Sequence, residues 1–261
     1  MDGFLFVNKP VGMTSFSCVS LIRKTIRRSD KKPTDDLIRN IKVGHAGTLD
    51  MAASGLLIVA IGRATKLIKY LMELDKKYIV TAEIGLLTDS LDLNGNILKK
   101  SCQKVKKEDL ESAIDFLGSS YWQIPPVYSA LKYNGKSLSI LARESKFTDK
   151  ELQKIVEQKK RLIDLYSLRM IDFSFPYFTL NCHVSHGTYI RSLANDISRK
   201  AKSFATTIDL ARTAIGPYEI SQAVELSMLR SSENILEHLH KDKDVESVVK
   251  AYSKSRYKLL L

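Results

Sequence analysis

At 261 residues the chain is long enough to bury the core of one large domain or of two modest ones. None of its apolar runs approaches the roughly 20 residues that a membrane-spanning helix needs, so the sequence argues against a transmembrane protein. Lys and Arg (41) outnumber Asp and Glu (29), and the net charge of +12 is typical of proteins that bind nucleic acid, although a Lys-rich composition can also reflect codon usage.

The three cysteines, Cys18, Cys102 and Cys182, are widely spaced and odd in number. Such a set argues against a disulfide framework and fits a reducing compartment. The first residues lack the basic stretch and the long apolar core of a signal peptide. We therefore expect a cytoplasmic protein that is not attached to a membrane.

Hydrophobic periodicity predicts the elements of the first half of the chain. Ser15 is expected to cap a helix that follows the first strand, and a charged segment interrupted by Pro33 is expected to be an exposed loop. In chain order we predict a strand at 4–7, a helix at 15–27, the exposed loop at 28–39, a strand at 56–62, a helix at 64–74, a strand at 77–85 and an acidic, turn-rich loop at 88–96.

The second half alternates helices and strands in the same way. In chain order we predict helices at 107–117, 137–143 and 149–160, paired strands at 162–175 and 177–184, a helix at 188–200, a strand at 206–215, a mostly helical segment at 222–240 and a basic, weakly patterned tail. There is no strict βαβ rhythm and no internal repeat. The pattern therefore predicts an α+β fold with a large mixed, mostly antiparallel sheet flanked by helices.

A glycine-rich loop, 44–50, carries a histidine and ends in a carboxylate, Asp50. Glycine permits backbone angles and close approaches that other residues forbid, so His45 and Asp50 are candidates to contact a ligand. Many glycine-rich turns that end in Asp are only turns, and this interpretation stays open on local chemistry.

Common cofactor motifs are absent from the sequence. It has no phosphate-binding G-x-x-x-x-G-K-[ST], no dinucleotide-binding G-x-G-x-x-G after a strand and no paired C-x-x-C. Cys182, His183 and His186 lie close in sequence, but residues 182 and 183 point to opposite faces of a strand and no second ligand pair exists. We expect core or surface roles for them, and chemistry performed by side chains without a metal or another cofactor.

Several segments, taken in order, resemble the motifs of the bacterial TruB family of tRNA pseudouridine-55 synthases. They are 8–15 (NKPVGMTS), 43–50 (VGHAGTLD), 63–66 (RATK), 76–78 (KKY), 85–95, 123–132 (QIPPVYSALK) and 187–193 (GTYIRSL). The resemblance extends from about residue 4 to residue 218. Each motif alone is weak, but their shared order makes coincidence a poor explanation.

The resemblance implies the pseudouridine synthase fold and an isomerase that converts uridine 55 in the T-loop of tRNA to pseudouridine, without a cofactor. It implies RNA binding, with the T-arm stem-loop of tRNA as the partner, and we expect a monomer. We expect the catalytic domain at 1–226. The remaining residues, 227–261, would form a short basic extension that is not a complete RNA-binding PUA domain.

The resemblance also implies roles for three catalytic residues, Asp50, Tyr78 and Arg191. Asp50 matches the essential aspartate, which would act as a nucleophile or a base. Arg191 matches the arginine that pairs with this carboxylate, although a surface ion pair is the alternative. Tyr78 matches a tyrosine that stacks on the target base and could remove its C5 proton, although an aromatic residue in a strand is more often core.

Three further residues, His45, Lys9 and Leu210, are implied to bind the RNA or to line the site. His45 matches a histidine that helps to extrude the base and occupies its place in the stack. Lys9 supports either the floor of the site or a phosphate. Leu210 matches an apolar residue that packs near the base, and this role is compatible with core packing.

The chain also departs from the family pattern. Met51 and Ala52 follow Asp50 where Pro-Leu is common, and the charged stretch 146–160 is longer than in compact relatives. Acidic residues of the 88–92 loop are expected to orient Arg191 or Tyr78. The basic tail is expected to bind RNA electrostatically through Lys241, Lys243, Lys250, Lys254, Arg256 and Lys258.

Two other functions remain as alternatives. One is an RNA-binding protein that helps tRNA to fold, and the other is a relative that acts inside an RNA-guided ribonucleoprotein. The set of Asp50, Tyr78 and Arg191 argues against a binder without catalysis, since binding alone does not need it.

Overall fold

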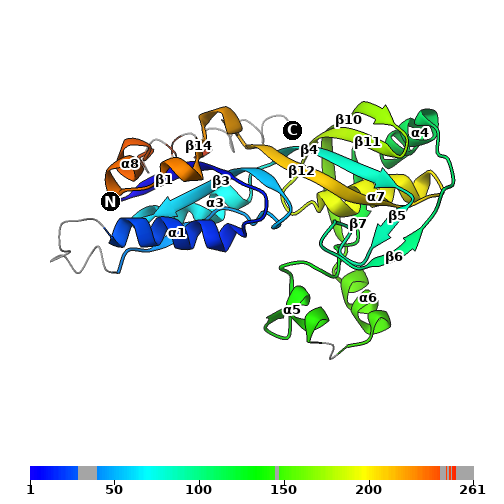
Figure 1. The fold of residues 1–261 in the computed structure, drawn as a ribbon, viewed down its shortest axis with the longest axis horizontal. Helices are drawn as coiled ribbons and strands as arrows, with labels where there is room; N and C mark the ends of the chain where they lie inside the picture. Colours follow the sequence, from blue (N-terminus) through cyan, green and yellow to red (C-terminus); the bar gives the residue numbers. More distant parts are fainter. Residues whose placement is uncertain (29–39, 145–146, 242–244, 246, 248, 251–261) are drawn as a thin grey trace. The chain divides into compact units, whose positions relative to one another are not determined.

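The computed structural model describes residues 1–28, 40–144, 147–241, 245, 247, 249 and 250, which form two compact units (Figure 1). The first unit contains Met1–Lys77 and the chain from Ala211 onward, and the second contains Tyr78–Leu210. Residues 29–39 of the loop predicted at 28–39 lie outside the described residues, as do Lys243, Lys254, Arg256 and Lys258 of the basic tail.

The first unit is built on a mixed sheet with the strand order β14-β1-β3-β12. β1 is antiparallel to β3, whereas β14 is parallel to β1 and β12 is parallel to β3. β2 and β13 are antiparallel to β3 and β12, respectively. The strands are β1 (Gly3–Lys9), β2 (Val43–His45), β3 (Ser54–Ile61), β12 (Ala205–Ile215), β13 (Tyr218–Glu219) and β14 (Val224–Glu225).

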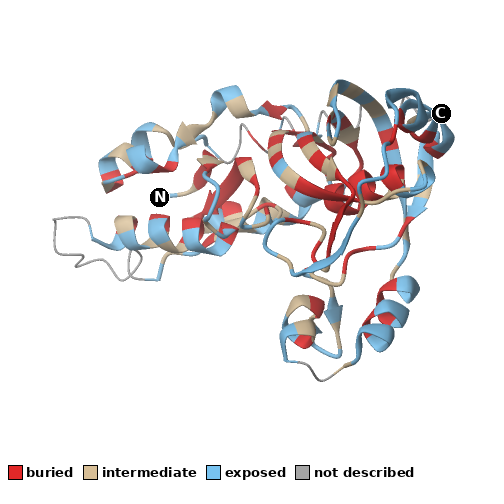
Figure 2. Cartoon of the chain, turned by 45° about the vertical axis from the view of Figure 1, so that its right-hand side comes forward, coloured by how far each residue is buried: buried red, intermediate tan, exposed pale blue. Residues whose placement is uncertain are grey.

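Both faces of β1 and β3 are buried, which explains why these strands are almost continuously apolar (Figure 2). Alternate side chains such as Phe6 and Ile58 pack with α3 (Ile68–Met72) in one core cluster. The intervening side chains, such as Val7 and Val59, pack with α1 (Ser15–Arg27) in a second cluster. A 3₁₀ turn, η1 (Gly62–Leu67), precedes α3.

In the second unit the strand order is β12-β4-β11-β10-β7. β11 and β10 form an antiparallel hairpin, and β7 is antiparallel to β10. Helices α4 and α7 pack against each other. These elements are β4 (Lys76–Ile84), α4 (Lys107–Leu117), β7 (Ser120–Gln123), β10 (Arg161–Ser174), β11 (Tyr177–Val184) and α7 (Ile190–Lys200).

A small lobe of the second unit has its own apolar core. Leu138 and Leu141 of α5 (Leu138–Arg143) pack with Ile155 and Val156 of α6 (Asp149–Gln158). Two short hairpins complete this unit, β5 (Leu86–Thr88) with β6 (Ile97–Lys100) and β8 (Lys132–Tyr133) with β9 (Lys136–Ser137).

The predicted fold class is confirmed, because the chain has a mixed, mostly antiparallel sheet with flanking helices. The prediction of a mostly helical 222–240 segment is wrong. That segment holds β14, the 3₁₀ turns η2 (Ile220–Gln222) and η3 (Leu226–Met228), and the short helix α8 (Ser232–Glu237), and His240 then forms a β-bridge with Phe4. Pairing with β1 satisfies the backbone there in place of a helix.

The predicted cap of the first helix also needs correction. The N-cap of α1 is Thr14, whose hydroxyl accepts a hydrogen bond from the backbone N–H of Ser17 at 3.0 Å. Ser15 is buried, and its hydroxyl binds a loop 34 residues further along the chain. The sequence contains suitable capping residues at both positions, so only the local geometry distinguishes them.

Candidate active site

The loop that carries Asp50 is held on both sides of the aspartate. Leu49, one residue earlier, donates its N–H to the Ser15 hydroxyl at 2.8 Å and accepts a hydrogen bond from that hydroxyl at 3.1 Å. Met51, one residue later, accepts a hydrogen bond from the N–H of Gly12 at 2.8 Å. Asp50 itself is half-buried. Hydrogen bonds therefore fix the backbone on both sides of Asp50, and its predicted catalytic role stays a prediction.

Arg212 of β12 binds the part of this loop that precedes Asp50. Its guanidinium donates to the carbonyls of Leu56 (2.8 Å), Gly47 (3.1 Å) and Thr48 (3.4 Å), and the residue is only 1% exposed. Gly47 has a φ of +101°, a conformation that glycine adopts without strain. A buried arginine thus connects strand β12 to the backbone that leads to Asp50.

Lys9, at the end of β1, lies in the same unit and is fully buried. Its ammonium donates to the carbonyls of Met13 (2.7 Å) and Pro10 (2.9 Å), so it braces the turn that also contains Gly12. Burial lowers the pKa of Lys9, whereas electrostatic interaction with Cys18 and with Asp50 opposes that shift. Lys9 thus binds the turn whose Gly12 donates to Met51, and its predicted role in the floor of the site stays a prediction.

His45 occupies the β2 strand at the start of the loop and is half-buried. Burial lowers the pKa of His45 below its ordinary value, and the nearby charge of Arg212 lowers it further. The ring is therefore neutral at neutral pH. Within the described residues its buried Nδ1 has no hydrogen-bond partner.

Arg191 lies in the first turn of α7, in the second unit, and is 4% exposed. Its guanidinium donates to the carbonyls of Ser90 and of Tyr128, the latter at 3.0 Å. It also forms an ion pair with Asp92 at 3.5 Å, in agreement with the expectation that the acidic loop orients this arginine. The predicted pairing of Arg191 with Asp50 joins residues of different units and stays a prediction.

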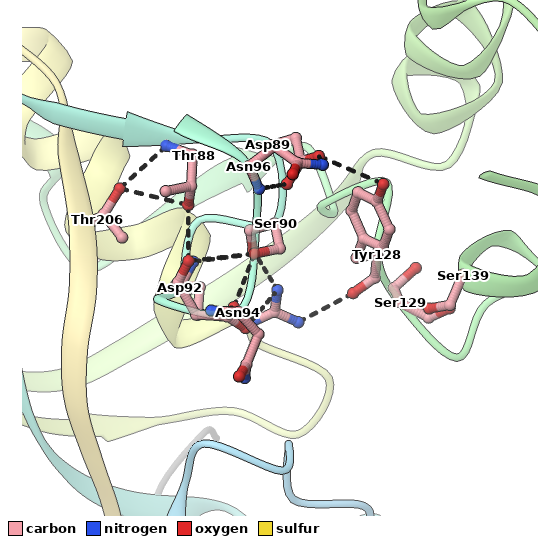
Figure 3. A network of polar contacts seen from close by, with 11 residues as sticks. Thr88, Asp89, Ser90, Asp92, Asn94, Asn96, Tyr128, Ser129, Ser139 and Thr206 are labelled. Carbon is pink, nitrogen blue, oxygen red and sulfur yellow. Dashed lines mark hydrogen bonds and ion pairs between the residues drawn. The ribbon is translucent and has the colours of Figure 1, made fainter. Parts of the chain in front are cut away.

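The loop that receives Arg191 is organised around Asp92 (Figure 3). Asp92 accepts hydrogen bonds from the hydroxyl of Ser90 (2.7 Å) and from the N–H of Asn94 (3.0 Å) through its side chain. Thr88 donates its hydroxyl to the Asp92 carbonyl at 2.8 Å. A Cβ at Gly95 would lie 2.3 Å from the Ser90 hydroxyl, so the turn requires glycine there.

Tyr78 and Leu210 are the first and last residues of the second unit. Tyr78 lies in β4 and Leu210 in β12, and both are buried. The structure therefore places both residues where the chain passes from one unit to the other. Their predicted contacts with the target base remain predictions.

Of the six predicted site residues, the first unit contains Lys9, His45 and Asp50, and the second contains Tyr78, Arg191 and Leu210. Sequence reasoning assigned no role to Arg212, and the other polar residues of β12, Thr206, Thr207, Asp209 and Thr213, leave no clear sequence signal that its side chain is buried. In the described part of the chain no group of three or more His, Cys, Asp and Glu residues could hold a metal ion. No helix in the described ranges is long and apolar enough to cross a bilayer.

The chain is similar to known proteins over most of its length. Residues 36–190 match the family described as TruB family pseudouridylate synthase (N terminal domain). The chain is 39% identical over 240 residues to tRNA pseudouridine synthase B of Clostridium kluyveri, with 92% of this chain and 75% of that protein aligned. It is 35% identical over 228 residues to pseudouridylate synthase TRUB1 of Mus musculus, with 85% of this chain and 65% of that protein aligned.

A solved structure resembles the chain at the level of the fold. The crystal structure of a Cbf5-Nop10-Gar1 complex aligns with a TM-score of 0.65 at 21% identity. The alignment covers 92% of this chain, which spans 60% of the matched chain. At this identity the likeness concerns the fold alone.

Proposed function

We propose that this chain, which belongs to the TruB family of pseudouridylate synthases, isomerises uridine 55 in the T-loop of tRNA to pseudouridine. Relatives named tRNA pseudouridine synthase B support tRNA as the substrate, and the net charge of +12 suits a polyanion. The observation that carries the proposal is the Asp50 loop, which hydrogen bonds fix on both sides of the carboxylate.

The reaction breaks the bond between N1 of uracil and C1′ of the ribose and forms a bond between C5 and C1′. The C5 proton leaves and N1 gains a proton, so the atoms balance without a redox partner. Asp50 can attack the ribose, attack the base, or assist formation of a glycal by accepting a proton. Each role needs a carboxylate held at a defined position, which the anchored loop supplies.

Access to the glycosidic bond requires the nucleotide to leave its stack, at a cost of a few kcal/mol. We assign His45 to this step, because a neutral, planar ring can replace the stacking of the extruded base. We assign Tyr78 to stacking on the flipped base and to removal of its C5 proton. Leu210 would pack against the same base.

Arg191 is proposed to pair with the Asp50 carboxylate and to keep it ionised and aimed. Hydrogen bonds to the carbonyls of Ser90 and Tyr128 and the ion pair with Asp92 hold this guanidinium in a defined orientation, which supports the proposed pairing. Lys9 is proposed to support the site floor through the turn that it braces.

The substitution Asp50→Asn tests the proposal. Asparagine retains the size of the side chain but is neither a nucleophile nor a base, so tRNA binding should change by less than about twofold while isomerisation falls below detection. Release of tritium from C5-labelled uridine in tRNA measures the reaction, and filter binding measures the affinity. Asp115→Asn on the exposed face of α4 is the matched control and should react normally. Isomerisation at the normal rate by Asp50→Asn would refute the role of Asp50.

An isolated T-arm stem-loop, used as the substrate, distinguishes the proposed function from the two alternative functions. We expect pseudouridine to form in an isolated T-arm stem-loop without any guide RNA or additional protein. A guided enzyme would be inactive on that substrate, and a folding helper would bind it without releasing tritium.

We further propose that the enzyme acts as a monomer in the cytoplasm, with a catalytic domain at 1–226 and a short basic extension after it. The free cysteines Cys18, Cys102 and Cys182 support a reducing compartment. Sedimentation of the protein, alone and in the presence of tRNA, tests whether it is a monomer.

A further inference from the structure

Gln123, at the end of strand β7, makes a two-point contact with the backbone of a distant residue. The residue is fully buried. Its side-chain Nε2 donates to the Tyr189 carbonyl at 3.0 Å, and its Oε1 accepts from the Tyr189 N–H at 2.8 Å. The amide thus pairs with both polar backbone groups of Tyr189, as a neighbouring strand would.

A third hydrogen bond orients this amide. Nε2 also donates to the hydroxyl of Tyr121 at 2.8 Å, and that hydroxyl donates to the Asp196 carboxylate at 2.9 Å. Burial raises the pKa of Tyr121 far above its ordinary value, so its hydroxyl keeps its proton. If the amide were reversed, its NH₂ group would face the Tyr189 N–H, which would then have no acceptor. One orientation of Gln123 is therefore favoured.

Tyr189 is the residue from which helix α7 begins. It is the N-cap of the helix but supplies no side-chain cap, and its carbonyl accepts the first helical hydrogen bond from Leu193 at 3.0 Å. Arg191 follows two residues later, in the first turn. Because a helix is stiff, the position of the Tyr189 backbone determines where the Arg191 side chain starts.

We propose that Gln123 is a positioning residue for pseudouridine formation, which fixes the backbone of Tyr189 and thereby places the guanidinium of Arg191. The inference rests on the proposed function, and in particular on a role of Arg191 in the reaction. Gln123 acts only through the start of α7, and it takes no direct part in the chemistry at Asp50.

The test replaces the amide and measures single-turnover isomerisation of tRNA. Gln123→Met keeps the length of the side chain but removes all three hydrogen bonds, and Gln123→Glu keeps the size and the acceptor but removes the donors. We expect either variant to lower the rate constant by about tenfold to about a hundredfold, with a change in tRNA affinity below about twofold. Gln103→Met and Gln103→Glu at an exposed position are the matched controls and should react normally.

A double-mutant cycle separates positioning from a general structural role. Arg191→Lys should itself slow the reaction measurably, and Gln123→Glu should then cost little more in the Arg191→Lys background, because the group that it places is already altered. Amide hydrogen exchange at the Tyr189 N–H should become faster in Gln123→Met, which removes its acceptor, and should change little in Gln123→Glu, which keeps it, and this readout is independent of catalysis. If one of the two Gln123 variants does not fold, the other variant takes its place in the double-mutant cycle.

The outcomes are distinguishable. Equal rate losses from Gln123→Glu in both backgrounds, or unchanged exchange at Tyr189 in folded Gln123→Met, would overturn the positioning role. A normal rate for Arg191→Lys would refute the proposed role of Arg191, and with it the route by which Gln123 acts. Absence of tritium release by the unaltered protein would instead refute the proposed function.

Discussion

Arg212 is a cation on a strand with mostly apolar neighbours, and its buried guanidinium binds three carbonyls around the Asp50 loop. A charge is costly to bury unless hydrogen bonds compensate for the missing water. The carbonyls of Gly47, Thr48 and Leu56 supply that compensation. The same hydrogen bonds hold the backbone of the loop in place. These hydrogen bonds link strand β12 to the backbone of the loop that ends in Asp50.

Removing this guanidinium should affect both stability and His45. Arg212→Met leaves three carbonyls without their donor, and we expect the free energy of unfolding to fall by about 2–4 kcal/mol. The pKa of His45 should rise, because the Arg212 charge now lowers it. NMR titration of the imidazole in the folded variant measures this, with Arg230→Met at an exposed position as the control. An unchanged or lower His45 pKa would contradict the electrostatic link.

Asp196 should make the stability depend on pH. Burial raises its pKa from 3.8 to about 6, so the folded state holds this proton more tightly than the unfolded chain does. The resulting stabilisation is complete below about pH 4 and disappears as the pH rises through about 6. Asp196→Asn retains an acceptor for Tyr121 and should stabilise the protein by about 2–3 kcal/mol at pH 7, and by little at pH 4. Urea unfolding at both pH values tests this.

Asp115→Asn in α4 provides the comparison for Asp196→Asn, because its carboxylate is exposed. As a surface substitution it should change the free energy of unfolding by less than about 0.5 kcal/mol at pH 7. A loss of stability at pH 7 in Asp196→Asn, with no loss in Asp115→Asn, would mean that the ionised Asp196 stabilises the fold.

At the scale of elements, local patterns predicted many of the helices and strands. The spacing of apolar residues predicts α4 at 107–117, and the helix has those bounds. The strands of the β10–β11 hairpin also match their predicted bounds, to within one residue at each end of β10. These elements bury one face, so their periodicity is visible in the sequence. β14 was missed because two residues carry no period and need β1 as a partner.

The close approach of β12 and β3 gives a prediction at this scale. A Cβ at Gly55 would lie 2.3 Å from the Arg212 carbonyl, and Gly55 has a φ of +107°. Gly55→Ala should therefore destabilise the fold by more than about 3 kcal/mol, since the strands must separate and the backbone is strained. Gly135→Ala is the control, because Gly135 has a φ of +82° but nothing lies within 4 Å of its added Cβ, so it should cost about 1–2 kcal/mol. Equal thermal shifts would contradict the packing argument.

At the scale of the whole molecule, the segment after β12 is part of the first unit and not only a charged tail. Val245 and Val249 are buried in the core cluster that contains Phe4 and Phe6, and the His240 ring stacks on Phe6 at 4.3 Å. Deletion after His240 would therefore remove core side chains together with charges. A test of RNA binding by this segment has to change its charges only.

We expect the basic extension to contribute to tRNA binding through counterion release. Lys241 and Lys250 are exposed, and replacing both by Gln should weaken binding and lower the slope of log affinity against log salt by about 0.7–0.9 for each phosphate that is no longer neutralised. Glu237→Gln in α8 is the control, because it changes the charge of the same segment without removing a cation. A slope that the two lysine substitutions leave unchanged would exclude them from the RNA interface.

The sequence by itself determined the α+β class, most elements with one buried face and, through ordered motifs, membership of the TruB family, whereas the catalytic role of Asp50 stays a prediction. Only the tertiary structure decided what surrounds these residues. Arg212 reaches Gly47 across 165 residues, and Gln123 reaches Tyr189 across 66. Such contacts depend on the register of the sheets and on the placement of whole elements. Local periodicity in the sequence predicts neither of them.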